Sequence, residues 1–361
     1  MVERKSDDAA ERSYTRDVGA VVFVCCLALA VFNFIVNPFN FYPTRLGPRF
    51  LFSDAIVKAQ LMKKSAPPEA LILGSSRTMA LSPSDVYQMT GLKTFNAGIR
   101  AAAPEDVAAV LQYALRDCGW HPRLLIIGVD VPYCCVEHPG DENLLAESQM
   151  AQYLPANFRR AWFCKGIDGL VSMSQTNDSL KAIHAAFSPS AAPPQEYSID
   201  ADGLMHFDLL EKLFTHGYPS GMAQLNIINK FFGAFPAPKQ DAMQKLVSMQ
   251  KLDEIVRTAS ERHMKILIFI TPYHPKLLAM LQKSSPFNYL RRSLVSHLDG
   301  LKRTYPGLAY EDLTDISSFG GDPVQFYDWV HCRPPNAHRI LSRLLLSPRS
   351  QYRRHIAVDP R

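Results

Sequence analysis

The stretch "ALILGSSRTMAL", residues 70–81, decides the fold expected for this chain. Its first four residues, Ala70 to Leu73, are apolar and predict a short buried strand, and a glycine and two serines follow at once. In an open parallel sheet, ligands bind beyond the carboxyl ends of the strands. The hydroxyls of Ser75 and Ser76 therefore fall where such a sheet holds its ligands. Capping of the following helix is the commoner role for a serine in this place.

Around this stretch, short apolar runs alternate with longer amphipathic segments. This order is typical of an α/β domain with a central, mainly parallel sheet. The segment from about 136 to 240 lacks the alternation, and we interpret it as an insertion that shapes a substrate surface. The predicted strands cover residues 70–73, 93–98, 123–131, 265–272 and 308–315, and the predicted helices cover about 83–90, 103–120, 242–263, 276–303 and 336–346.

The N-terminal region contains an uncharged apolar run, Val18 to Val36. Its length is close to the roughly 20 residues that cross a bilayer as a helix. We expect an uncleaved anchor rather than a cleaved signal peptide or a buried core helix, because bulky aromatic residues follow the run. More basic residues precede the run than follow it closely, which favours a cytoplasmic N-terminus. The expected order is a cytoplasmic tail 1–17, an anchor 18–36, a linker 37–66 and an extracytoplasmic domain 67–361.

Composition limits the classes of function. The chain has 361 residues, of which 47% are hydrophobic and 20% charged, so it can bury a large core and is not a disordered protein. Its 39 basic and 34 acidic residues are spread along the chain, which disfavours nucleic-acid binding. Five of the seven cysteines lie outside the apolar run and form no CxxC pair, so a zinc site has no support and any disulfide pairing stays open.

A second polar constellation lies near the C-terminus, in "FYDWVHCRPPNAHRIL", where Asp328 precedes His331 by three residues. A histidine activates a serine hydroxyl best when a carboxylate holds its other ring nitrogen. The spacing lets the two side chains meet. A structural Asp–His pair is the commoner reading, and a metal site that adds Cys332 and His338 fits no common ligand spacing.

These motifs resemble the SGNH (GDSL-type) hydrolase superfamily. The resemblance rests on a strand ending in Gly-x-Ser, a glycine after the second strand and the C-terminal Asp-x-x-His. It covers residues 70 to about 128 and 265 to 346. With an N-terminal anchor and GSS in place of GDS, the chain looks closest to extracytoplasmic O-acyl-transfer proteins, such as those of alginate O-acetylation and teichoic-acid D-alanylation. The resemblance implies a three-layer, flavodoxin-like α/β sandwich.

The resemblance also implies roles for single residues. Ser76 matches the nucleophile, His331 its base and Asp328 the partner of that base, while Ser75 stands in place of the usual aspartate. The backbone N–H of Gly98 matches an oxyanion-hole donor, together with the N–H of Ser76. This chemistry needs no metal and no cofactor.

One position departs from the family pattern. An asparagine usually completes the oxyanion hole after the third strand, and this chain offers Asp130, whose ionised carboxylate would repel an oxyanion. Asp130 itself, Arg77 beside the nucleophile, and Tyr273 and His274 after the fourth strand are candidates for substrate binding. A surface ion pair explains Arg77 at least as well. An ordinary strand-to-helix turn is the commoner explanation of Tyr273 and His274.

The expected function is therefore an esterase or O-acyltransferase that acts on a cell-envelope or exported glycan. If the acyl group must cross the membrane, the resemblance implies a multispanning acyltransferase as partner. The departure at Asp130 motivates an alternative, a catalytically inactive domain for glycan binding or envelope assembly. In a third interpretation GSS is a phosphate-binding turn, which predicts affinity for phosphorylated ligands that persists in His331→Ala.

Overall fold

The structure is a computed structural model that divides into two compact units, residues 1–52 with 156–194, and residues 53–155 with 195–361. It describes residues 2–39, 41–42, 53–131, 142–145, 147–187, 197–215, 247–283 and 285–346. Each unit is described by itself. Cys134 and Cys135, with part of the predicted insertion, lie outside these residues.

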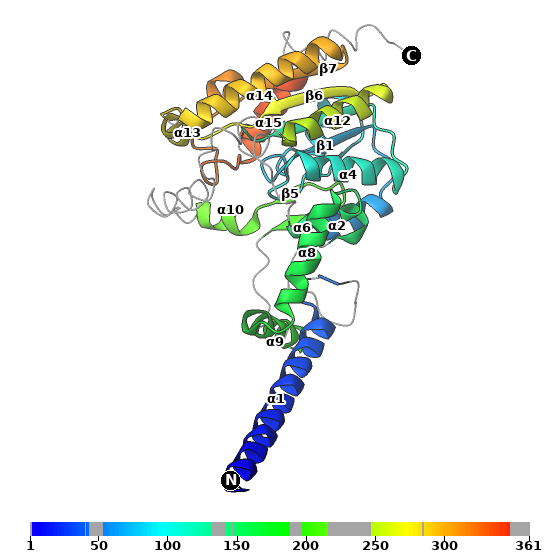
Figure 1. Cartoon of the computed structure of the whole chain (residues 1–361). Coiled ribbons are helices and arrows are strands. Elements are labelled where there is room, and N and C mark those ends of the chain that lie inside the picture. The colour runs from blue at the N-terminus through cyan, green and yellow to red at the C-terminus, as the bar shows by residue number, and fades with distance from the viewer. Residues whose placement is uncertain are drawn as a thin grey trace. The chain divides into compact units, whose positions relative to one another are not determined.

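The larger unit is built on a five-stranded parallel sheet of strand order β2-β1-β3-β6-β7 (Figure 1). The order places β1 between β2 and β3, at the point where the chain reverses its direction of winding. This confirms the α/β fold class expected from the sequence. The strands are β1 (Ala70–Leu73), β2 (Thr94–Asn96), β3 (Leu124–Val129), β6 (Lys265–Ile270) and β7 (Leu308–Asp312).

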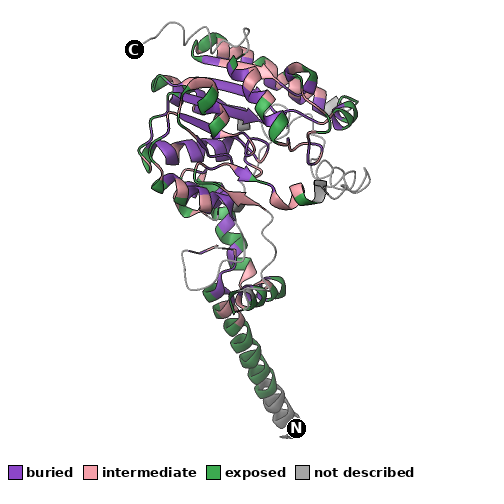
Figure 2. Ribbon diagram, turned by 180° about the vertical axis from the view of Figure 1, so that it is seen from behind, coloured by how far each residue is buried: buried purple, intermediate pink, exposed green. Residues whose placement is uncertain are grey.

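Helices cover both faces of this sheet. One face packs against α3 (Pro83–Thr90) and α15 (Pro334–Leu346), in a core that includes Ile72, Ile126 and Phe269. The other face packs against α4 (Pro104–Arg116), α12 (Val247–Glu261) and α14 (Ser285–Thr304). Because both faces are covered, the inner strands β1, β3 and β6 are almost wholly buried, while the edge strand β7 is mostly half-buried (Figure 2). The other elements of this unit are α2 (Asp54–Lys64), α6 (Glu142–Leu145), α7 (Ser148–Ala151), α10 (Asp208–Thr215), α13 (Pro275–Leu281) and the 3-10 helix η3 (Ile316–Phe319).

Local signals explain where the helix after β1 begins and ends. The Ser82 side chain accepts a hydrogen bond from the Asp85 N–H, Pro83 occupies the first turn, and Gly91 ends the helix at a φ of 76°. Ser82 therefore caps α3. Ser75 and Ser76 lie earlier, in the turns that join β1 to this helix, so the usual capping role does not account for them.

Part of the predicted insertion folds onto the larger unit as a short antiparallel hairpin, β4 (Ser198–Ile199) and β5 (Met205–His206). Its turn contains Gly203 at a φ of 83°, as the sequence "DADG" indicates. Met205 donates its N–H to the Met79 carbonyl, 3.1 Å away, which attaches the hairpin beside the turn after β1. This segment therefore reaches the edge of the sheet where Ser76 lies.

The smaller unit consists of α1 (Val2–Val36), α8 (Ala156–Gly169) and α9 (Met173–Phe187). Within α1, the 24 residues Ser13–Val36 are long and apolar enough to cross a membrane. Their side chains are almost all exposed (Figure 2). The expected anchor thus corresponds to a single apolar helix, which the rest of the smaller unit contacts at its C-terminal end.

Candidate active site

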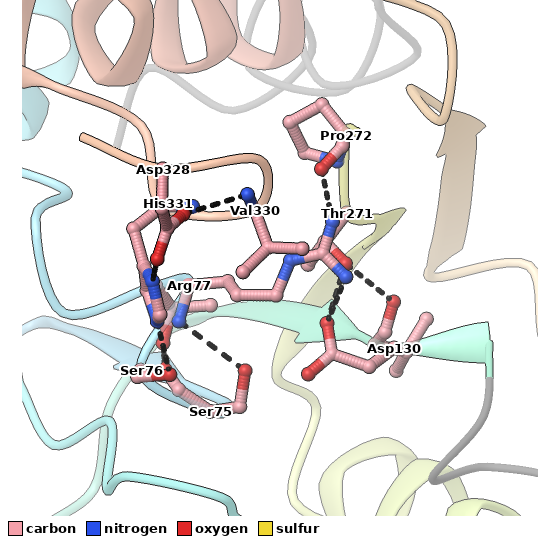
Figure 3. A network of polar contacts seen from close by, with 11 residues as sticks. Ser75, Ser76, Arg77, Asp130, Thr271, Pro272, Asp328, Val330 and His331 are labelled. Carbon is pink, nitrogen blue, oxygen red and sulfur yellow. Dashed lines mark hydrogen bonds and ion pairs between the residues drawn. The ribbon is translucent and has the colours of Figure 1, made fainter. Parts of the chain in front are cut away.

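Three side chains predicted from the sequence form one chain of hydrogen bonds. Ser76 Oγ lies 2.8 Å from His331 Nε2, and His331 Nδ1 lies 2.6 Å from Asp328 Oδ2 (Figure 3). Ser76 and His331 are 255 residues apart in the sequence. The parallel sheet brings them together, because the carboxyl end of β1 and the segment between β7 and α15 meet at the same edge.

The loop that carries Asp328 and His331 fixes their mutual geometry. Asp328 Oδ1 accepts hydrogen bonds from the backbone N–H groups of Val330 and His331, each 2.7 Å long. An aspartate that bonds the backbone two and three residues ahead closes a tight turn. The second carboxylate oxygen is thereby aimed at the imidazole. The spacing of three residues thus has a local structural cause.

The electrostatics suit a general base. Burial alone would raise the pKa of Asp328, but the His331 charge and three hydrogen bonds from residues 330 and 331 lower it. Burial, with help from the Arg77 charge, would lower the pKa of His331, but the Asp328 charge and hydrogen bond raise it above its ordinary value. The ionised Asp328 can only accept a hydrogen bond, so Nδ1 carries the proton and Nε2 is left to accept one from Ser76.

Arg77, the residue after Ser76, turns away from the Ser76–His331 pair toward Asp130 (Figure 3). Its guanidinium Nη1 lies 3.2 Å from Asp130 Oδ1, and the two side chains are only 7% and 2% exposed. Burial opposes the charge on Arg77, but Asp130 raises the pKa of the guanidinium above its ordinary value. The pair joins the ends of the neighbouring strands β1 and β3.

Other contacts hold this buried ion pair on both sides. Arg77 donates to the Pro272 carbonyl and lies over the Tyr273 ring, 4.2 Å from its centroid, while Asp130 accepts a hydrogen bond from the Thr271 hydroxyl. Arg77 Nε and Asp130 Oδ2 find no hydrogen-bond partner among the described residues. The Asp130 carboxylate, which stands where the SGNH pattern has an asparagine, is therefore paired with the Arg77 guanidinium.

Gly98 lies beside the turn after β1, where a buried asparagine holds it. The Gly98 N–H donates to Asn96 Oδ1, 3.0 Å away, and Asn96 Nδ2 donates to the carbonyls of Thr78 and Leu81, both at 2.9 Å. The Gly98 carbonyl accepts a 2.6 Å hydrogen bond from the buried Lys58 Nζ. The N–H predicted to serve an oxyanion is thus already paired in this structure, and its role stays a prediction.

The remaining sequence candidates lie close to the site with structural tasks of their own. Tyr273 is buried beneath Arg77. His274 caps α13 by accepting a hydrogen bond from the Lys276 N–H, and its ring stacks on Trp329. Burial raises the pKa of Cys332 to about 12, which keeps this thiol protonated and unreactive at neutral pH. A substrate contact at Tyr273 or His274 stays a prediction.

Sequence reasoning missed several residues that shape the site. Asn96 and Lys58 brace the turn after β1, and Thr271 anchors Asp130. Phe207, within the predicted insertion, lies with its ring 5.8 Å from the His331 ring and shields one side of it. A polar residue at the end of an apolar strand, such as Asn96 in "TFNAG", was the one usable signal.

Comparisons with known proteins add little to this geometry. No protein-family model matches the chain, and no curated protein matches it. One solved structure aligned with the chain is a Bacteroides fragilis protein provisionally described as an acylhydrolase, at 11% sequence identity and a TM-score of 0.39. The alignment covers 86% of this chain and 99% of that one. The function is therefore argued from the site itself.

Proposed function

We propose that this protein is a membrane-anchored serine esterase or O-acyltransferase. The observation that carries the proposal is the continuous series of hydrogen bonds from Ser76 through His331 to Asp328. A serine, a neutral imidazole nitrogen and a half-buried carboxylate at these distances match the arrangement that activates a hydroxyl for attack on a carbonyl carbon. The resemblance of the same three residues to the SGNH pattern agrees with this assignment.

The reaction would proceed in two steps. His331 Nε2 takes the Ser76 proton as Oγ attacks the ester carbonyl, and Asp328 stabilises the imidazolium that forms. His331 then returns the proton to the departing alkoxide oxygen, which leaves an acyl-Ser76 ester. In the second step a water or sugar hydroxyl gives its proton to His331 and attacks the carbonyl carbon of this ester. His331 returns the proton to Ser76 Oγ as the bond from Oγ to the acyl carbon breaks, which releases the carboxylic acid or the acylated sugar.

The site of action follows from the N-terminal helix. A helix long enough to cross a bilayer, preceded by basic residues, would place the catalytic unit outside the cytoplasm. The acceptor we propose is a cell-surface or exported glycan, with a multispanning acyltransferase supplying the acyl group where it has to cross the membrane. Both assignments rest on the resemblance.

A serine-reactive fluorophosphonate probe tests the proposal on the full chain in detergent. We expect labelling of the wild type and none of Ser76→Ala or His331→Ala. Ser84→Ala serves as the matched control, because this exposed serine lies eight residues further on and should leave labelling unchanged. Failure to label folded wild-type protein would contradict the proposal.

A second candidate function is an inactive, glycan-binding domain. It is favoured by Asp130, which supplies a paired carboxylate where the family has a donor to the oxyanion, and by the Gly98 N–H, which already donates to Asn96. Loss of one oxyanion donor costs about 10²–10³ in rate. Glycan binding that persists in Ser76→Ala, together with absent probe labelling, would favour this candidate.

A further inference from the structure

The helix α9 in the smaller unit has an unusual distribution of side chains. Its buried residues are mostly polar: Gln175, Thr176 and Ser179. Its large apolar residues are exposed instead, Met173 by 74%, Leu180 by 56% and Phe187 by 85%. A helix that packs on a water-soluble core shows the opposite distribution.

The buried polar face of α9 is joined to α1 through one asparagine. Asn33 is fully buried, and its Nδ2 donates to Thr176 Oγ1 and to the Leu170 carbonyl, both at 2.8 Å. Ser179 Oγ donates to Asn33 Oδ1, also at 2.8 Å. Hydrogen bonds of this kind join helices in a bilayer, where unpaired polar groups are costly. These hydrogen bonds of Asn33 fix α9 to the apolar helix α1.

The position of Asn33 in α1 sets the level along this helix at which α9 is attached. The 24-residue segment Ser13–Val36 rises about 36 Å as a helix, slightly more than the roughly 30 Å of a bilayer's hydrocarbon core. Asn33 lies three residues before the end of this segment, or about 4.5 Å along the axis. A bilayer spanned by α1 therefore ends close to the level at which α9 is attached.

The exposed surface of α9 is itself amphipathic. Met173, Leu180 and Phe187 are spaced by seven residues and form one row along the helix. Among the exposed polar residues, Asn177 and His184 lie next to this row, and Ser174 and Lys181 lie further from it around the helix. The preceding α8 continues the pattern with the exposed apolar residues Phe163 and Ile167 and the exposed basic residues Arg159, Arg160 and Lys165.

We propose that α8 and α9 form a membrane-interface element, which lies in the headgroup region of the bilayer that α1 crosses. The Met173–Leu180–Phe187 row enters the outer part of the acyl chains, and the basic residues of α8 contact anionic headgroups. The lipid bilayer is favoured as occupant because Asn33 attaches α9 to α1 three residues before the end of the segment that is long enough to cross a membrane. The inference rests on the proposed anchor and is independent of Ser76 chemistry.

Tryptophan quenching in vesicles tests this placement. Leu180→Trp and Phe187→Trp, in the full chain reconstituted into mixed phosphatidylcholine and phosphatidylglycerol, should lose emission when the lipids carry bromine near the headgroup end of their acyl chains. The native tryptophans, measured in wild-type protein, supply the background to subtract. Ser174→Trp is the matched control from the polar side, and its emission should change little.

Two results would overturn the inference. Emission of Leu180→Trp and Phe187→Trp that aqueous iodide quenches and bromolipid does not would place the row in water. Emission that neither quencher reaches would mean that protein, such as a second copy of the chain, covers the row. Neither result bears on the fluorophosphonate test, so failure here and failure of the catalytic proposal are distinguishable.

Discussion

Ser76 differs from an ordinary turn serine by the imidazole that faces it. Its neighbour Ser75 is buried, and its Oγ accepts a hydrogen bond from the Arg77 N–H, 3.3 Å away, which is a common way to stabilise a turn. Ser82 caps the helix that follows. Those two hydroxyls have structural partners, whereas the Ser76 hydroxyl faces His331 Nε2. The local structure thus leaves Ser76 as the hydroxyl available for chemistry.

Asp328 should control both the rate and the pH dependence. Asp328 raises the pKa of His331, so the base becomes neutral, and active, only above that raised value. In Asp328→Asn the acid limb of kcat/KM for an activated aryl ester should move to lower pH. The maximal rate should fall by about 10⁴, because the imidazole loses its orienting partner. An acid limb that stays in place would contradict the assignment of His331 as base.

The intact Arg77–Asp130 ion pair should give a higher free energy of unfolding than a variant that keeps only one of the two charges. In Asp130→Ala the buried guanidinium is left without its counter-charge, and we expect a loss of about 3–5 kcal/mol in the free energy of unfolding. The double variant Arg77→Met/Asp130→Leu removes both charges and should lose less than Asp130→Ala does. Urea unfolding measures both values. A double variant that loses as much as Asp130→Ala, or more, would contradict the buried pair.

The carboxyl ends of the strands β1, β2 and β3 pack around one side chain, that of Thr78. A Cβ added at Gly98 would lie 2.5 Å from Thr78 Oγ1, and one added at Gly128 would collide with Thr78 Cγ2. Thr78 Oγ1 also donates to the Ser75 carbonyl, 2.8 Å away. Close packing around Thr78 therefore holds the turn that presents Ser76.

Gly128→Ala should lower the free energy of unfolding by about 1–3 kcal/mol through overpacking. Adding Thr78→Ser removes Cγ2 and should restore part of this loss, since only the contact with the Phe269 ring remains. The same second substitution should not help Gly98→Ala, whose collision is with the Oγ1 that serine keeps. Thermal or urea unfolding of the four variants distinguishes the two cases. Equal rescue of both glycine variants would contradict the packing described.

The helix α2 places a lysine in the core behind the site. Burial lowers the pKa of Lys58 to about 7, although Asp54 and Asp202 partly oppose the shift. In the unfolded chain the pKa returns to about 10.5, so between these values the unfolded state binds more protons and stability rises with pH. Lys58→Met should remove this rise, measured by urea unfolding between about pH 7 and 10. If the free energy of unfolding changed with pH in the same way in wild type and Lys58→Met, the lowered pKa of Lys58 would be contradicted.

His331 contributes to the pH dependence of stability with the opposite sign. Its pKa is raised on folding, so its stabilising effect is complete below the unfolded value and is lost as pH rises through the folded one. Because wild type and Lys58→Met share this histidine, their difference isolates the lysine.

Across the whole chain, the sequence predicted the sheet better than what surrounds it. Apolar runs such as Leu124–Val129 are unbroken because both faces of the sheet are covered, and this pattern is legible without a structure. The signals at the ends of α3 are equally local. The linker predicted over residues 37–66 contains the helix α2, which the sequence does not reveal because it is short and carries three lysines, one of them the buried Lys58.

The site was predictable in its residue types but not in its pairings. Ser76, His331 and Asp328 stood out through strand-end position and spacing, yet their meeting depends on contacts across 255 residues. From the sequence, Arg77 and Asp130 are two separate candidates for substrate binding. No sequence pattern reveals that two residues at neighbouring strand ends form an ion pair with one another. In the smaller unit, the exposed apolar row of α9 can be interpreted only because the structure shows that polar residues of the same helix are buried and hydrogen-bonded to Asn33.

The proposed reaction requires that Ser76 becomes covalently acylated. Intact-protein mass spectrometry after brief exposure of the full chain to an activated aryl acetate, quenched with acid and followed by peptide mapping, measures this directly. We expect one acetyl group on the peptide that contains Ser76, and none in Ser76→Ala. A wild-type chain that stays unmodified, or one whose acetyl group maps to another residue and persists in Ser76→Ala, would contradict it.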